Sequence, residues 1–215
     1  MQQKERGMNQ SLLEALSHLQ AGRFLRARKS ALAALSTEQS LREAKAGLPY
    51  GERLSATAHL IAADASHALQ DATLRDKHWQ QALDVLPIPG NTQDIEIREG
   101  AQMRAARWAL DDRDAAESIR RLGELPLGAG RRTIALRIKL KAARLSGDTQ
   151  AALDTARLLA KHRAFSPAAS ASVVRGLLLA SIRDARDTSS LQQFWLSLDE
   201  DERAMPEVAI PATER

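Results

Sequence analysis

Apolar residues along this chain recur three or four positions apart rather than in strict alternation. The clearest stretch follows the turn at Gly147, where Ala152, Ala156 and Leu159 fall on one helical face. Runs of β-branched and aromatic residues with period-two alternation do not occur, and 95–97 is too short and too charged for a strand. The pattern therefore predicts an all-α fold without a β-sheet.

The helical segments occur in pairs, each joined by a short turn at Gly or a polar residue. Turns are expected at Gly22, Gln70, 111–112 and Gly147, and segments containing Pro or Gly separate one pair from the next. The turns lie 48, 41 and 36 residues apart, intervals longer than the ~34 residues of a regular tetratricopeptide array. The earlier pairs therefore need longer connections.

We expect one helical-repeat domain over residues 1–215, built as a tetratricopeptide-like α-α superhelix of antiparallel helix pairs. The expected pairs cover residues 9–46, 52–87, 93–125 and 132–164, followed by an incomplete last unit at 167–205. The segment 134–145 fits this arrangement because it carries two apolar stripes, as a helix between its own partner and the next repeat requires. One stripe contains Ile134, Ala135, Ile138, Ala142 and Leu145, and the other contains Leu136, Leu140 and Ala143.

Composition narrows the function classes. Cysteine is absent, which excludes disulfides, thiolate metal sites and cysteine nucleophiles. No stretch approaches the ~18 consecutive apolar residues of a membrane span, and residues 1–20 lack the apolar core of a signal peptide, so the chain as given is expected to be soluble. The 31 basic residues face 27 acidic ones, and this modest excess does not by itself indicate nucleic-acid binding.

Catalytic and cofactor-binding motifs are missing. Gly128-Ala129-Gly130 begins like a dinucleotide fingerprint, but Thr133 stands where the third Gly belongs and no strand precedes it. We interpret it as a loop between repeats. The five histidines show no metal-ligand spacing. A lone helical histidine such as His59 or His67 is more often a structural or surface residue than an axial haem ligand, so neither is a predicted site residue. We therefore expect no enzyme activity, no cofactor and no metal.

Three tryptophans, Trp79, Trp108 and Trp195, are expected in the hydrophobic core rather than along a peptide-binding groove.

The most distinctive charge feature is a basic run without acidic residues from Leu125 to Gly147. The predicted partner-binding residues in it are Arg131, Arg132, Arg137, Lys141 and Arg144. One interpretation is a solvated flank whose long side chains cover the core; the other is a docking surface for an acidic partner or anionic lipid, with a second patch at Arg23, Arg26 and Lys29. RNA is disfavoured because stacking aromatics are not interleaved with the cations.

The order of several segments resembles the HemY family of proteobacteria, a membrane-anchored tetratricopeptide-repeat family linked to a late step of protohaem synthesis. The segments are Gln20-Ala21-Gly22-Arg23-Phe24, the Ala-rich stretch from Ala58 to Ser66, Gln80-Gln81-Ala82-Leu83, and Phe194-Trp195-Leu196-Ser197-Leu198. The resemblance implies a soluble repeat portion, facing the cytoplasm, of a protein of the bacterial inner membrane. It brings no catalytic residues with it.

Two functional hypotheses follow. The first is a non-catalytic scaffold or regulator that binds other proteins. The resemblance to the HemY family implies that these partners are enzymes of the haem pathway. The alternative is a carrier that binds a tetrapyrrole directly.

Overall fold

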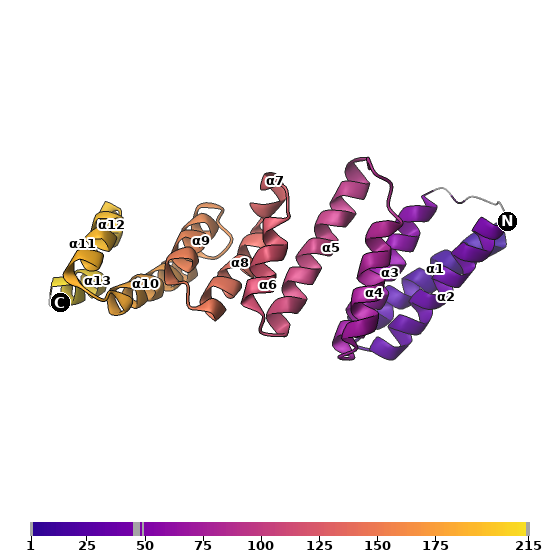
Figure 1. Ribbon diagram of the computed structural model, residues 1–215, viewed down its shortest axis with the longest axis horizontal. Helices are drawn as coiled ribbons and strands as arrows, with labels where there is room; N and C mark the ends of the chain where they lie inside the picture. The colour runs from indigo at the N-terminus through magenta and orange to yellow at the C-terminus, as the bar shows by residue number, and fades with distance from the viewer. Residues whose placement is uncertain (1, 45–47, 49, 214–215) are drawn as a thin grey trace. The chain divides into compact units, whose positions relative to one another are not determined.

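The computed structural model describes residues 2–44, 48 and 50–213 and is built from helices, with no strand among these residues (Figure 1). This confirms the predicted all-α class, and residues 95–97 lie inside a helix. The chain divides into two compact units, Met1–Arg104 and Ala105–Arg215. The expectation of a single repeat domain stays a prediction. None of the described helices is long and apolar enough to cross a membrane.

The first unit consists of two helical hairpins and the first part of a fifth helix (Figure 1). Its helices are α1 (Gln2–Gln20), α2 (Phe24–Glu43), α3 (Gly51–Ala68), α4 (Ala72–Asp84) and α5 (Thr92–Asp111), of which α5 continues into the second unit. Small residues allow close packing of α1, α2 and α3, where Ala15, Ala31 and Ala62 are fully buried in one cluster. The last residues of the predicted pair 9–46 lie outside the described residues.

One turn recurs between paired helices. At Gly22, Gln70, Arg113 and Gly147 the backbone has a positive φ, and the last turn of the preceding helix closes with two backbone hydrogen bonds. At Gly22 these run from Arg23 N–H to the His18 carbonyl (2.8 Å) and from Gly22 N–H to the Leu19 carbonyl (3.1 Å). The shared geometry shows that the hairpins repeat one local design.

An aspartate follows three of these turns and caps the next helix. Asp71, Asp114 and Asp148 accept hydrogen bonds from backbone N–H groups three residues ahead, which satisfies donors that the first helical turn leaves free. The third turn was expected at 111–112, but α5 extends through Asp111 and the left-handed residue is Arg113. The cap at Asp114 fixes this position.

Up to residue 213, the last one described, the second unit contains the end of α5 and eight further helices. They are α6 (Ala115–Gly123), α7 (Leu127–Gly130), α8 (Thr133–Ser146), α9 (Thr149–Lys161), α10 (Pro167–Asp184), α11 (Thr188–Leu196), α12 (Glu200–Arg203) and α13 (Pro206–Thr213). As its two apolar stripes predict, α8 packs against both α6 and α9. The hydrophobic core of the second unit includes the fully buried Leu153, Leu159 and Leu178.

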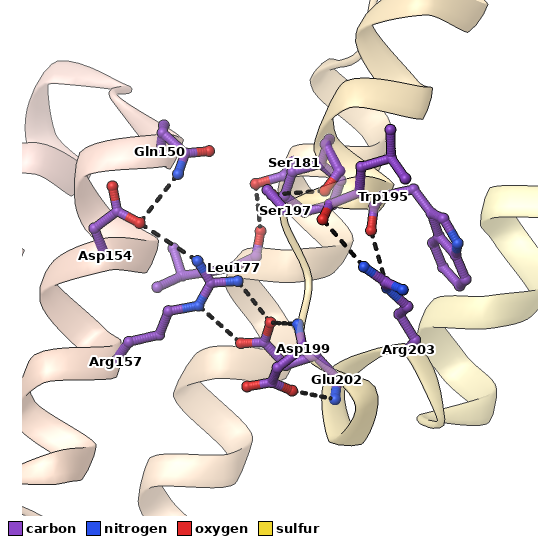
Figure 2. A network of polar contacts seen from close by, with 12 residues as sticks. Gln150, Asp154, Arg157, Leu177, Ser181, Trp195, Ser197, Asp199, Glu202 and Arg203 are labelled. Atoms are coloured by element: carbon purple, nitrogen blue, oxygen red, sulfur yellow. Dashed lines mark hydrogen bonds and ion pairs between the residues drawn. The ribbon is translucent and has the colours of Figure 1, made fainter.

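A partly buried ion pair connects α9 to α12 (Figure 2). The Arg157 guanidinium donates two hydrogen bonds to Glu202, at 2.8 and 2.6 Å, and the Glu202 side chain is only 5% exposed. Glu202 also accepts from the Asp199 backbone N–H, while Asp199 accepts from the Glu202 backbone N–H, so the two close a capping box at the start of α12. The pair thus ties a four-residue helix to the core.

Candidate interaction surfaces

The first unit carries a groove of about 550 Å³ lined by alternate helices, α1, α3 and α5. Its lining residues are Leu12, Leu13, Leu16, Arg53, Thr57, Leu60, Ile61, Gln93, Glu96, Ile97, Gly100 and Arg104. Each helix contributes positions three, four or seven apart, which place one stripe of side chains toward the groove. The intervening helices α2 and α4 do not contribute to this lining.

Two leucines make this groove apolar at its surface. Leu13 is 66% exposed and Leu16 is 43% exposed, although both are large hydrophobic residues. The nearly buried Leu60 and Ile61 continue the apolar surface below them. A concave surface with exposed aliphatic side chains and polar groups at its margin is typical of a site that buries part of a ligand.

Ion pairs between helices hold the polar margin of the groove in place. The Arg53 guanidinium of α3 donates to Asp94 of α5 at 2.8 Å and also to the Gln93 side chain. The Arg104 guanidinium donates to Asp64 at 3.0 Å. Both pairs link α3 to α5, so they fix the spacing of two groove walls before any ligand binds.

Asp94 also caps the start of α5. It accepts a hydrogen bond from the Asn91 backbone N–H at 2.9 Å, and the Asn91 side chain accepts one from the Asp94 N–H at 3.1 Å. The Asn91 N–H and the Arg53 guanidinium hold the pKa of Asp94 below its usual value. The carboxylate therefore stays charged in its contact with Arg53 at neutral pH.

A second, more polar cavity of about 600 Å³ lies among α2, α3 and α4. His59 lines it and places its Nδ1 atom 3.0 Å from Nδ1 of His78 on α4. Burial, together with the neighbouring His78, lowers the pKa of His59 to about 4, and burial also lowers the pKa of His78. Both imidazoles are therefore neutral at physiological pH, with one donating to the other.

No group of three or more His, Asp or Glu side chains in the described part of the chain has an arrangement that could hold a metal ion. Of the tryptophans, Trp108 is buried and Trp195 packs against the core of the second unit. Trp79 packs against a core cluster of the first unit and donates its indole N–H to the Ala101 carbonyl at 3.0 Å. The predicted core position is confirmed for Trp108, whereas Trp79 and Trp195 are half-buried at the edge of a core cluster.

The predicted basic residues lie on or just before α8 in the second unit. Arg131 and Arg132 precede the helix, whereas Arg137, Lys141 and Arg144 occupy successive turns of it, and all five are exposed. Arg137 also has a structural contact, because its guanidinium donates to the Ala164 carbonyl at 2.6 Å and lies 5.1 Å from the centroid of the Phe165 ring. The assignment of these residues to partner binding stays a prediction.

Helix α6 shows how the same unit neutralises cations elsewhere. Arg120 and Arg121 each donate to Glu117 at 2.6 Å and lower its pKa to about 2. On α8, by contrast, Arg137, Lys141 and Arg144 lie three or four residues apart without an acidic residue on the helix. Like charges at this spacing destabilise an isolated helix by about 0.2–0.5 kcal/mol per pair.

The groove was not among the predicted sites. The sequence pattern that indicates the groove is an apolar face on α1 that is wider than packing against one helix requires. It consists of Leu12, Leu13, Leu16 and Leu19. Its opposite wall, on α5, depends on the irregular connection between the second hairpin and the third helix pair. That connection carries no pattern that fixes the position of α5.

No family model, curated protein or solved structure matches this chain. The resemblance to the HemY family accordingly rests on the sequence segments alone.

Proposed function

We propose that this chain is a non-catalytic protein-interaction module that binds a short peptide segment of a partner in the groove lined by α1, α3 and α5. The observation that carries the proposal is the exposure of Leu13 and Leu16 at a concave surface whose polar margin is already fixed by ion pairs. Burying these leucines against a partner removes apolar surface from water, which is the main favourable term in association.

The helix hairpins and their repeated turn support a tetratricopeptide-like superhelix as the architecture of this module. In such arrays, one helix of each pair lines the concave surface and its partner lies behind it. The lining by α1, α3 and α5, with α2 and α4 excluded, follows this alternation. The HemY resemblance adds the proposal that the partners are haem-pathway proteins at the bacterial inner membrane.

The experiment selects ligands from a library of random peptides, about a dozen residues each, and measures their affinity for three forms of the chain by fluorescence anisotropy. The test variant is Leu13→Glu/Leu16→Glu. The control is Leu25→Glu/Leu32→Glu on α2, whose side chains are 66% and 44% exposed and lie outside the groove.

The two variants make matched changes in charge and in exposed apolar area. We expect selected peptides to bind the groove variant at least about tenfold more weakly, because ~1.4 kcal/mol is lost when two leucine contacts become buried carboxylates. The α2 variant keeps its affinity. Equal affinity for all three forms, or selective loss in the α2 variant, refutes the groove assignment.

The tetrapyrrole-carrier alternative draws on one observation, the neutral His59 imidazole at the edge of the polar cavity. Titration with haem decides it. A carrier develops a shifted Soret band that His59→Ala removes, whereas a protein-binding module shows no shift that depends on His59.

A further inference from the structure

Exposed cations on α8 and on the connection from α9 to α10 form one surface in the second unit. Arg137 joins them, because its guanidinium donates to the Ala164 carbonyl at 2.6 Å. Arg163 directly precedes Ala164 and is exposed, so its backbone lies within about 4 Å of Ala164. We use "α8 basic surface" for Arg137, Lys141 and Arg144 together with this connection.

The α8 basic surface forms no ion pair within the part of the chain that the structure describes. No acidic residue occurs between Leu125 and Gly147, and none occurs from residue 155 to residue 183, which includes the α9–α10 connection. Within the described residues, no ion pair is formed by Lys141 or Arg144. The positive potential of this surface is therefore available to an outside anion.

Exposed apolar side chains flank the cations. At about 100° per residue, Ile134, Arg137, Lys141, Arg144 and Leu145 all fall within one sector of roughly 100° on α8. Ile134 is 55% exposed and Leu145 is 38% exposed, while Ile138 and Leu140 are buried in the unit. Along the helix axis the cations lie between Ile134 and Leu145, and around the axis both aliphatic residues lie at one edge of the sector.

We propose that the α8 basic surface binds an acidic amphipathic helix of a partner protein. Carboxylates three or four residues apart pair with Arg137, Lys141 and Arg144, and apolar side chains at the two ends pack on Ile134 and Leu145. This inference rests on the proposed function as an interaction module, but it concerns a different unit and a different ligand chemistry from the leucine groove.

A partner helix fits the exposed strip better than a lipid surface does. A helix that lies on a membrane buries a continuous apolar face in the acyl region. The apolar faces of α8 are already buried against α6 and α9, and only Ile134 and Leu145 remain at the ends of the strip.

The test uses a labelled synthetic peptide of about 18 residues, long enough for five helical turns, with Glu three or four residues apart and Leu at both ends. Its affinity for the full chain is measured by fluorescence anisotropy at about 50 mM and about 300 mM salt. A peptide with Gln in place of every Glu is the ligand control. The variants are Lys141→Glu/Arg144→Glu and the neutral Lys141→Gln/Arg144→Gln, which leave Arg137 in contact with Ala164.

The matched control is Lys4→Glu/Arg6→Glu on α1, which changes the net charge equally at two exposed positions outside the groove and outside the candidate basic patches. We expect at least about tenfold weaker binding by the α8 reversal variant, a smaller loss in the neutral variant, and less than about twofold change in the α1 control. Affinity also falls at the higher salt concentration, and the Gln peptide does not bind.

Three results overturn the proposal. The first is that the acidic peptide fails to bind the unaltered chain. The second is an equal loss of affinity in both charge-reversal variants, which shows that binding depends on net charge alone. The third is that Leu13→Glu/Leu16→Glu abolishes peptide binding while the α8 variants retain it, which places the peptide in the groove. Vesicles of phosphatidylcholine with about 30% phosphatidylserine provide the other arm. Vesicle binding that depends on Lys141 and Arg144, without peptide binding, identifies a lipid surface instead.

Discussion

The partly buried ion pair between Arg157 and Glu202 leads to a quantitative prediction about the stability of the C-terminal helices. In Arg157→Gln the aliphatic stem largely remains, but the Glu202 carboxylate loses a charged partner and two hydrogen bonds of 2.8 and 2.6 Å. Breaking a fully buried pair costs about 3–5 kcal/mol. Because the Arg157 side chain is 28% exposed and water partly replaces it, we expect a loss of about 2 kcal/mol.

The control is Arg175→Gln, which breaks the 3.0 Å pair with Glu207 on α13. Its partners are 44% and 51% exposed, so its loss costs less than about 1 kcal/mol. Native-state hydrogen exchange followed by mass spectrometry measures the opening of residues 199–209 in both variants. About 2 kcal/mol corresponds to roughly thirtyfold faster exchange in Arg157→Gln.

Equal exchange rates in Arg157→Gln and Arg175→Gln refute this reasoning. They show that burial of Glu202 does not set the local stability, and that the capping box and the apolar contacts hold α12 without Arg157. A double-mutant cycle with Glu202→Gln then separates the pair energy from the cost of an unpaired buried carboxylate.

Three further predictions concern single contacts. Arg137→Ala lowers the free energy of unfolding of the second unit by about 1 kcal/mol in urea titration, because it removes the hydrogen bond to Ala164 and the stacking on Phe165; an unchanged midpoint contradicts this. The pKa of His59 is about 4 in the folded chain and 6.5 in the unfolded chain, so the unfolded chain binds more protons between these pH values. The first unit therefore loses stability as pH falls from about 6.5 to about 4. In urea titrations at several pH values, the free energy of unfolding of His59→Gln depends less on pH than that of the unaltered chain; an equal dependence contradicts this. Gly147→Ala destabilises by about 1 kcal/mol because the residue has φ +73°, whereas Gly176→Ala stabilises α10 by a similar amount because its added Cβ meets open space within a helix; thermal melts that shift in the same direction for both contradict the backbone argument.

The helical class could be predicted from sequence because Ala and Leu at helical spacing leave little alternative. The turns at Gly22 and Gly147 could also be placed, since glycine adopts positive φ without strain. The turn at Arg113 could not. An arginine is an uncommon residue in the left-handed region, and its position follows from the hydrogen bonds that close α5 and from the Asp114 cap.

The candidate sites also differ in how much of each could be predicted from the sequence. A basic run such as that of α8 is visible in sequence because it needs only residue types and helical spacing. The contact of Arg137 with Ala164 and Phe165 is invisible, since it depends on how α8 and α9 pack. Exposure of Leu13 is likewise a tertiary property, because the sequence cannot show which face of α1 its neighbours leave open.

The central claim, peptide binding in the groove of α1, α3 and α5, is tested most directly by methyl NMR of the full chain with labelled Leu, Ile and Thr. A library-selected peptide is titrated in, and methyl shift changes are mapped onto the structure. The account predicts the largest changes at Leu13, Leu16, Thr57 and Ile97, with Leu25 on α2 unchanged. Changes that centre on α2 or on α8 and spare the groove contradict it.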